Sequence, residues 1–491
     1  MRKISMIIIL GGLLFSSCQK YLDVNTTPNN PTSVPASTLL PNTTIGLAFA
    51  NANDLNRATS ALVQHIAGVA NQTQLYDVYA LDGNFDNQWN LEIYSGCIDN
   101  LQILINQDST TSPAYSGIAK LEMAYVFSMA TDIWGAVPYS QAGQGLIFPT
   151  PRFDKVEDIY QGNSALGIRS LFDLVNSGLA DLGKVSLLKP GTDDIVYKGD
   201  LTKWQRMGNT LLLKFAMLIS NLNPTLAKTT IQNVITGNNY INSPANEFAV
   251  PFSLSVGNQN PIFSFNNLNR PADQMLSQRL LNLSKSLNDT VRLAKFFTKP
   301  TGAFVAFDNG LTIAAAPQAQ RSKYNTYLTG DRSGNTADGK SGGDSSIKIL
   351  TASQVDFILA ESALILGTTG DPNALYQAGI TASMQRVGMT ATEIATYFST
   401  NPTVVTLAGT PEQKRQQIIT QKYMSLIGNG IEAFDDYRRT GYPVLTLVNN
   451  PQGDDPAVIP TRLPYTPNEL SRNPNAPNPR PKTDVKLIWA K

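Results

Sequence analysis

Leu121-Glu122-Met123-Ala124-Tyr125-Val126-Phe127-Ser128-Met129-Ala130 is the stretch that decides the fold, because apolar residues occupy both sides of its helical wheel. One face carries Leu121, Ala124, Tyr125 and Ser128, and the other carries Met123, Val126, Phe127 and Ala130. A helix that is apolar on both sides is buried in a protein core. We therefore expect this helix to be buried nearly all round.

The same helical period recurs along the chain on both sides of this stretch. It predicts helices near positions 60, 95, 125, 170, 210, 275, 360, 380 and 420. These helices fall in pairs separated by short breaks, although no strict repeat of about 34 residues is visible. The pattern predicts an all-α fold in which helix pairs stack into a tetratricopeptide-like superhelix.

Four stretches lack the helical period and are predicted to be irregular, with minor short strands. They are Asn71 to Asn87, Phe248 to Arg270, Ala315 to Ser346 with its five glycines, and Gly441 to Lys491, in which Val485 to Trp489 is a candidate strand. Long ordered loops in a helical body commonly carry binding sites. We expect ligand contacts in these stretches.

The amino terminus has the pattern of an export signal that ends in a cysteine. Arg2 and Lys3 precede a short apolar run, and Ser16-Ser17-Cys18 follows it. A basic start, a short apolar core and a small-residue end are typical of such signals. We expect residues 1–17 to be removed and Cys18 to be acylated, the alternative being an ordinary signal whose cysteine is incidental. Residues 18–41, rich in Pro, Asn and Thr, then form an extended tether, and residues 42–491 form a single binding domain.

The overall charge bounds the class of ligand. The chain has 38 Lys and Arg against 37 Asp and Glu, a net charge of +1, and charged residues make up only 15% of it. Nucleic-acid binding depends on clustered basic residues, so we expect no nucleic-acid partner. A near-neutral surface suits an uncharged ligand. With Cys18 acylated, Cys97 is left without a disulfide partner and is expected to be a small buried residue.

Several motif matches lack the context that their chemistry needs. Gly334 to Ser341 fits the phosphate-loop spacing without the flanking strand and helix, and a flexible loop is the favoured interpretation. The sole histidine, His65, lies in an apolar helical context and excludes a two-histidine zinc motif. Asp82 to Asp86 begins like a calcium loop but lacks its later Gly and Glu, so a non-standard calcium site stays open. We predict no cofactor, no metal and no catalytic residues, although scattered carboxylates leave a glycosidase pair open.

Aromatic and amide residues in the irregular stretches are the candidate ligand contacts. Aromatic faces stack on sugar rings, and amides and carboxylates bond the hydroxyls. The candidates are Tyr76, Tyr79, Asn84, Asp86 and Trp89 in the first stretch, and Phe263, Phe265, Tyr324 and Tyr327 in the later ones. For Trp89 the alternative is a core position in the next helix, whereas Tyr76 and Tyr79 are expected to be exposed.

Motifs spread over the whole chain resemble the SusD/RagB family of outer-membrane nutrient-binding lipoproteins. They are Cys18 to Asn25 with Pro28-Asn29-Asn30-Pro31, Asp132-Ile133-Trp134-Gly135-Ala136-Val137-Pro138-Tyr139, Arg270-Pro271-Ala272-Asp273, Glu432-Ala433-Phe434 with Arg438-Arg439-Thr440-Gly441-Tyr442-Pro443, and Ile459 to Tyr465.

This resemblance implies a tetratricopeptide-like body with a binding face built from loops. It implies a lipid anchor on Cys18 in the outer membrane, with the protein facing the cell exterior, and a SusC-like TonB-dependent transporter as partner. It implies capture of oligosaccharide or polysaccharide nutrients without catalysis and their delivery to the transporter. The alternatives are a peptide ligand, a surface-anchored glycoside hydrolase, and an adhesion or scaffold protein. No ligand-contacting residue carries over, and Arg438, Arg439 and Arg462 are expected to pin loops onto the helices.

Overall fold

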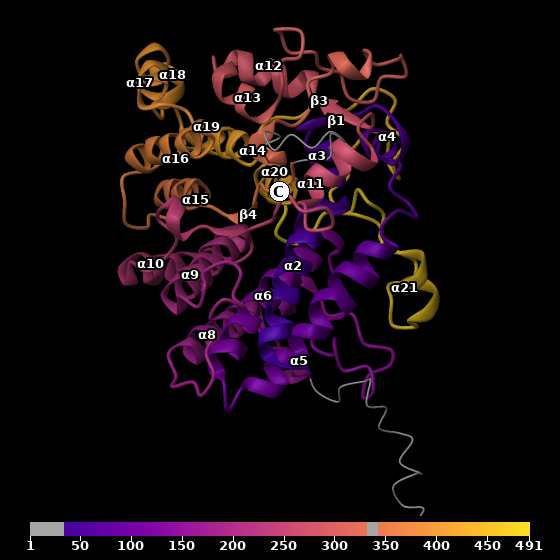
Figure 1. Cartoon of the computed structure of the whole chain (residues 1–491), viewed down its shortest axis with the longest axis vertical. Coiled ribbons are helices and arrows are strands. Elements are labelled where there is room, and N and C mark those ends of the chain that lie inside the picture. Colours follow the sequence, from indigo (N-terminus) through magenta and orange to yellow (C-terminus); the bar gives the residue numbers. More distant parts are fainter. Residues whose placement is uncertain (1–33, 331–341) are drawn as a thin grey trace, which may run out of the picture.

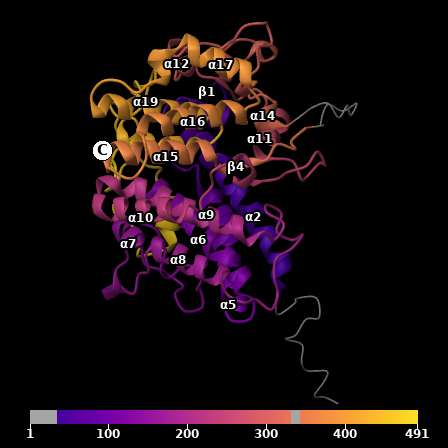
Figure 2. The ribbon, with the colours of Figure 1, turned by 90° about the vertical axis from the view of Figure 1, so that its left-hand side faces the viewer.

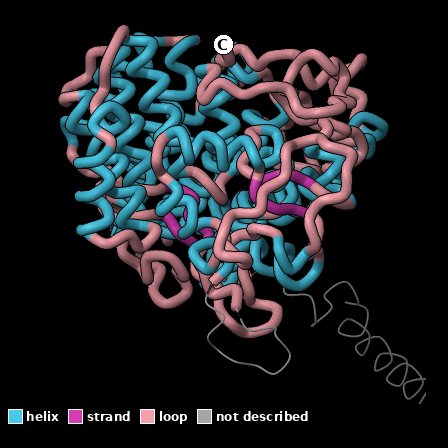
Figure 3. Tube along the Cα trace, turned by 90° about the horizontal axis from the view of Figure 1, so that it is seen from above, coloured by secondary structure: helices cyan, strands magenta, loops and turns pink. Residues whose placement is uncertain are grey.

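The computed structural model describes residues 34–330 and 342–491. Cys18, the export signal and Gly334 to Ser341 lie outside these residues. Figures 1 and 2 show stacked helices that run from α8 at one end of the molecule to α17 at the other. Figure 3 shows that the helices gather on one side, while much of the irregular chain lies on the other. The predicted all-α architecture of stacked helix pairs is confirmed.

The first half of the stack surrounds α6, which contains the stretch from Leu121 to Ala130. Nearly every residue of α6 is buried, as predicted. The helices of this half are α2 (Ala36–Ala52), α3 (Asp54–Leu62), α4 (Asn71–Asp77), the π-helix η1 (Gln88–Ile98), α5 (Asp99–Asp108), α6 (Pro113–Trp134), α7 (Val156–Gln161), α8 (Leu171–Leu182), α9 (Leu201–Leu218) and α10 (Pro224–Gly237).

The second half continues the stack with α15 (Ala352–Ile365), α16 (Pro372–Arg386), α17 (Ala391–Thr400), α18 (Pro402–Val405), α19 (Pro411–Ser425) and α20 (Gly430–Thr440). Shorter helices lie in the irregular side: α11 (Pro261–Phe263), the π-helix η5 (Ser264–Asn269), α12 (Gln278–Ser286), α13 (Thr290–Phe296), α14 (Thr326–Thr329) and α21 (Pro467–Arg472). Single 3₁₀ turns are η2 (Ser164–Leu166), η3 (Ile219–Asn221), η4 (Pro244–Asn246) and η6 (Gln318–Gln320).

In the described parts of the chain, two small antiparallel sheets join distant segments. β1 (Ile66–Gly68) pairs with β3 (Gln274–Leu276), and β2 (Phe248–Val250) pairs with β4 (Ile347–Leu350). In the described residues no helix combines the length and the apolar character that a membrane crossing requires. Cys97 is buried, as predicted, and lies against Gly46; within the described residues it forms no disulfide.

The helix layers approach closely where glycines face each other. A Cβ atom at Gly117 of α6 would lie 2.9 Å from the carbonyl oxygen of Gly178 in α8, and a Cβ at Gly178 would lie 2.9 Å from that of Gly117. Real side chains do not pack that closely against backbone, so this crossing requires the absence of a side chain. The two glycines let α6 and α8 pack backbone to backbone.

Of the three arginines predicted to pin loops onto the helices, Arg438 does so through hydrogen bonds. Arg438 donates from Nη1 to the carbonyl oxygens of Asp132 and Thr461, and thereby ties a carboxy-terminal loop to α6. Arg439 instead joins two helices, because its guanidinium donates to both carboxylate oxygens of Glu361 at 2.7 Å. The prediction for Arg439 is therefore wrong. Arg462 stacks over the Tyr465 ring of its own loop, and its guanidinium also lies against Gly135 at the end of α6.

Several boundaries differ from the sequence predictions. The predicted tether extended to Pro41, whereas α2 begins at Ala36 and contains Pro41. Pro41 has no backbone N–H and so removes one hydrogen bond from the helix. The helix still forms because it buries Leu39 and Leu40, and this burial outweighs the low helix propensity of proline. The stretches predicted to be irregular contain short helices: α4 in the first, α11 and η5 in the second, α14 in the third and α21 in the fourth. Val485 to Trp489 forms no strand, because Trp489 is buried beneath the Arg438 guanidinium instead of pairing its backbone.

Candidate functional site: a glutamine-lined groove

The predicted aromatic residues of the first irregular stretch lie in the core. Tyr76 and Tyr79 are 0% and 1% exposed, so the prediction that they are exposed is wrong. The Tyr76 ring stacks on Phe85 at 5.6 Å because α4 turns it inward. Trp89 packs against Trp134 at 5.0 Å, which confirms the alternative of a core position. These side chains stabilise the fold and are not available to stack on a ligand.

The polar candidates of the same stretch make local structural bonds. Asn84 donates from Nδ2 to the carbonyl oxygens of Leu81 and Asp82, at 3.1 and 3.0 Å. Asp86 accepts from the backbone N–H of Asn468 at 3.2 Å. The Asp82 carboxylate pairs with Arg480 at 2.9 Å. Within the described part of the chain, no three His, Cys, Asp or Glu side chains gather as metal ligands would.

The later candidates lie in separate places. Phe263 is buried, and Phe265 lies beneath the Arg57 guanidinium at 3.8 Å. Tyr327 packs edge-on against Phe296. Tyr324 reaches the wall of a cavity of about 570 Å³. Tyr79 and Asn84 border a different cavity, of about 340 Å³. The structure therefore does not bring the nine candidates together in one site.

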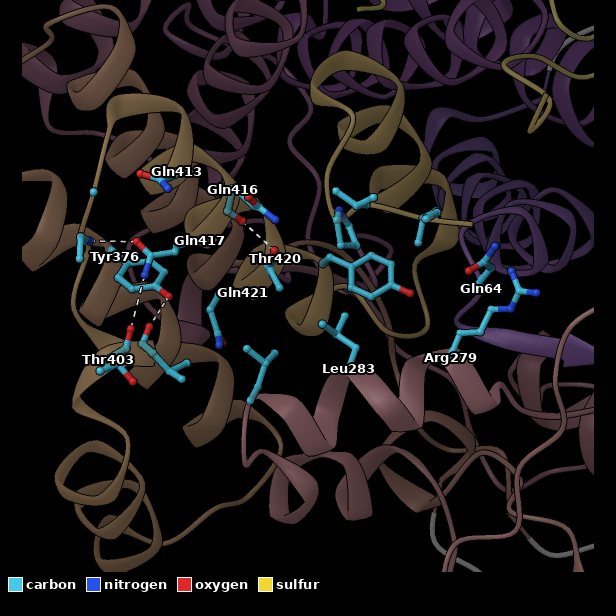
Figure 4. Close-up of a pocket in the computed structure, with 18 of the residues that line it drawn as sticks. Gln64, Arg279, Leu283, Tyr376, Thr403, Gln413, Gln416, Gln417, Thr420 and Gln421 are labelled. Atoms are coloured by element: carbon cyan, nitrogen blue, oxygen red, sulfur yellow. Dashed lines mark hydrogen bonds between the residues drawn. The ribbon is translucent and has the colours of Figure 1, made fainter. Parts of the chain in front are cut away.

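A larger groove, of about 720 Å³, lies between α19, α12 and the segment 443–446. We call it the glutamine groove. Figure 4 shows Gln416, Thr420 and Gln421 of α19 on one side, Leu283 on the other, and Gln64 with Arg279 at one end. Its lining residues are Gln64, Arg279, Leu283, Leu287, Tyr376, Thr403, Val404, Ala408, Gly409, Gln413, Gln416, Gln417, Thr420, Gln421, Tyr423, Pro443, Val444, Leu445 and Thr446.

One face of α19 supplies the amides. Gln413, Gln417 and Gln421 recur every four residues, with Gln416 and Thr420 beside them, so helical geometry brings all five to one face. Gln413 Oε1 accepts from the Thr410 N–H at 2.8 Å in a capping box that fixes the start of the helix. The side chain of Gln416 is exposed in the groove.

Gln421 is buried at the floor of the groove. Its Oε1 accepts from Arg292 at 2.6 Å. Its Nε2 is also buried, next to the Tyr397 side chain. These contacts hold Gln421 in place, so this side chain shapes the floor of the groove.

The opposite wall is apolar and held in place. Leu283 comes from α12, Leu287 directly follows that helix, and the Val444 side chain is 69% exposed beside them. Elsewhere in the groove, the hydroxyls of Tyr376 on α16 and Tyr423 on α19 each donate to a backbone carbonyl oxygen at 2.7 Å, which fixes both rings. The groove thus presents amides on one side and a preformed apolar surface on the other.

The groove has almost no net charge. Among its described lining residues, Arg279 alone is charged, and its Nε lies 2.8 Å from the Asp308 carboxylate outside the lining. Burial acts to raise the pKa of Asp308, but the hydrogen bonds from Arg279 and Asn449 lower it overall, so this carboxylate stays ionised and offsets Arg279. A neutral, amide-lined groove is suited to a neutral polar ligand with one apolar face.

The sequence analysis did not predict this groove, although one of its two walls can be recognised in the sequence. The helical spacing of the glutamines in α19 marks a polar face with no charge on it. The opposite wall comes from segments more than a hundred residues earlier and about twenty residues later, and no local pattern links them.

Comparison with known proteins agrees with this architecture. The profile of the SusD-like family, described as "Starch-binding associating with outer membrane", matches residues 28–466. No curated protein sequence matched.

Solved structures share the fold at low sequence identity. A structure described as a chitin-binding protein superposes with a TM-score of 0.76 at 22% identity, over 93% of this chain and 100% of the other. A chitin-binding SusD homologue from Flavobacterium johnsoniae gives 0.72 at 23% identity, over 93% and 97%. A SusD/RagB family protein from Bacteroides thetaiotaomicron gives 0.75 at 21% identity, over 93% and 98%. Because the family profile spans most of its length, the chain belongs to the SusD-like family.

Proposed function

We propose that this protein is a lipid-anchored, outer-membrane glycan-binding protein that captures an oligosaccharide in the glutamine groove and passes it to a TonB-dependent transporter. The family description, starch binding in association with the outer membrane, supports the surface and the ligand class. Two of the structural neighbours are described as chitin-binding, which supports the same class.

The observation that carries the proposal is the pairing of amides and apolar surface across a neutral groove. A pyranose ring has hydroxyls around its edge and C–H groups on its faces. The α19 amides can donate to and accept from the hydroxyls, while Leu283 and the exposed Val444 cover a C–H face.

The lining of the groove supports binding without cleavage. Glycoside hydrolysis uses two carboxyl groups placed on either side of the scissile bond. The described lining residues include no Asp or Glu. A glycan held there would leave intact, which is what delivery to a transporter requires.

The anchor and the partner are further parts of the proposal. An acyl chain on Cys18 would hold the protein at the membrane. Mass spectrometry of the natively produced protein tests this directly, since the mature amino terminus should carry lipid on Cys18. Co-purification of an outer-membrane transporter with the native protein tests the partner.

A glycan panel followed by isothermal titration calorimetry tests the ligand and the site. Gln416→Ala and Val444→Ser, on opposite walls, should each weaken binding of the ligand by about tenfold, because each removes a hydrogen bond or an apolar contact. Gln385→Ala, exposed on α16 outside the groove, is the matched control and should bind like the wild type.

The outcomes separate the alternatives. Unchanged affinity in both groove variants would place the glycan elsewhere on the protein. Binding of extended peptides but no glycan would favour the peptide alternative, because glutamine amides also pair with peptide backbone. Release of shortened glycan would favour the hydrolase.

A further inference from the structure

A second cavity differs from the glutamine groove in its charge. It holds about 570 Å³, shares no lining residue with the groove, and is walled by the segments 266–271, 298–300 and 318–329. We call it the basic cavity. Its lining residues are Asn266, Asn267, Pro271, Thr298, Lys299, Pro300, Gln318, Ala319, Arg321, Lys323, Tyr324, Asn325, Thr326 and Thr329. Three of these side chains are cationic, and the described lining includes no carboxylate.

Backbone pairing holds the two lysines on one wall. Phe297 and Tyr324 form an antiparallel bridge, and the Thr298 N–H donates to the Lys323 carbonyl oxygen at 2.9 Å. The Lys323 N–H donates in return to Thr298 Oγ1 at 3.1 Å. Lys299 and Lys323 therefore lie on two neighbouring segments whose backbones are hydrogen-bonded to each other.

Arg321 is held by neutral groups. Its Nε donates to the carbonyl oxygen of Ala316 at 2.7 Å, and its Nη1 donates to that of Ala272. Carbonyl oxygens orient a guanidinium without cancelling its charge. Burial lowers the pKa of Arg321 and the nearby Asp273 carboxylate raises it, but arginine stays protonated in proteins. Asp273 is itself bonded to Asn71 at 2.9 Å and does not line the cavity.

Lys299 has an aromatic neighbour. Its ammonium lies 4.6 Å from the centre of the Phe304 ring, a contact that positions the charge and leaves its sign unchanged. In a chain whose net charge is only +1, Lys299 and Arg321 bring to this cavity two cations whose hydrogen bonds and ring contact are with neutral groups.

We propose that the basic cavity binds an oxyanion, a carboxylate or a sulfate, carried on a sugar ring. Lysine ammonium and arginine guanidinium groups are the usual partners of such groups, and arginine can bind them through two parallel hydrogen bonds. Gln318, Thr326 and the edge of Tyr324 line the same cavity and are suited to sugar hydroxyls. The saccharide part of this inference rests on the proposed function, whereas the anion preference rests on the cavity alone.

The test titrates the full mature chain with matched oligosaccharides of three kinds: neutral, carboxylated and sulfated. At least one acidic series should bind, and raising the salt concentration should weaken it, because exposed charges are screened. The double variant Lys299→Gln with Lys323→Gln should bind that series about tenfold or more weakly. Lys285→Gln, exposed on α12 outside both cavities, is the matched control and should be unaffected.

Separate readouts keep this inference distinct from the proposed function. The lysine double variant should leave binding of a neutral ligand in the glutamine groove unchanged, and Gln416→Ala should leave binding of the acidic series unchanged. Which acidic series binds identifies the anion. Wild-type affinity of the double variant for acidic saccharides, or no binding of either acidic series, would overturn the inference. Inorganic sulfate that competes at the same concentration as the saccharide would overturn its saccharide part.

Discussion

Glu122 provides a test of the buried packing of α6. Its side chain is fully buried, and its carboxylate oxygens accept from Thr44 Oγ1 at 2.6 Å and Thr43 Oγ1 at 2.9 Å, both on α2. Burial raises the pKa of Glu122 from its ordinary value of 4.5 to about 8, and the two threonine hydrogen bonds only partly oppose this. At neutral pH the folded protein therefore holds a proton that the unfolded chain releases.

The sign and the size of the effect follow from this difference. Between about pH 4.5 and pH 8 the unfolded state loses the proton first, so the unfolding free energy falls as pH rises, by about 1.4 kcal/mol per pH unit. Glu122→Gln removes the titration, and its amide can donate to one threonine and accept from the other. Between about pH 5.5 and pH 7.5, the unfolding free energy of the variant should rise by about 3 kcal/mol relative to that of the wild type.

Differential scanning calorimetry at both pH values measures this gain. A chain of this length has an unfolding entropy of about 1 kcal/mol/K, so the difference in Tm between the variant and the wild type should grow by about 3 °C. Glu157→Gln, at a partly exposed position on α7, is the control and should show no such growth. If the difference in Tm between Glu122→Gln and the wild type is the same at both pH values, the raised pKa of Glu122 is refuted.

Three other changes test the packing. Glu361→Gln leaves the buried Arg439 without its bidentate partner and should lower the unfolding free energy by about 3–5 kcal/mol; a Tm within about 1 °C of the wild type would contradict this. Gly178→Leu places a side chain against the Gly117 carbonyl and should destabilise the protein by about 3 kcal/mol or more, measured by the same calorimetry; wild-type stability would show that α6 and α8 can separate freely. Trp89→Ala should cost about 3–5 kcal/mol while glycan affinity in the folded variant stays unchanged, and a selective loss of affinity would return Trp89 to the binding site.

The helical body was predictable because burial repeats at the helical period. The prediction that α6 is buried nearly all round and the prediction that Cys97 is buried are both confirmed, since each depends on the apolar character of neighbouring positions. The start of α2 was not predictable in the same way. Pro41 indicated an extended segment, and only contacts with later helices make a helix stable there.

The candidate site was mostly mispredicted, because aromatic residues occur both in protein cores and on sugar-binding surfaces. Tyr76 and Trp89 are residue types typical of a sugar-binding surface. The Tyr76 ring nevertheless packs against Phe85, beyond the end of α4, and the Trp89 ring packs against Trp134 in α6. Composition records which side chains are present in a stretch. It does not record whether another part of the chain covers them.

By itself, the sequence determined the stacked helices, the irregular carboxy-terminal segment and the amide face of α19, because each depends on spacing between near neighbours. The tertiary structure alone decided that this face lies opposite Leu283 and Val444, and that Lys299 and Arg321 line one cavity. The physical reason is that a cavity is made by surfaces that meet only after the chain has folded. The free energy that brings those surfaces together comes from the buried core behind them, not from the residues that line the cavity.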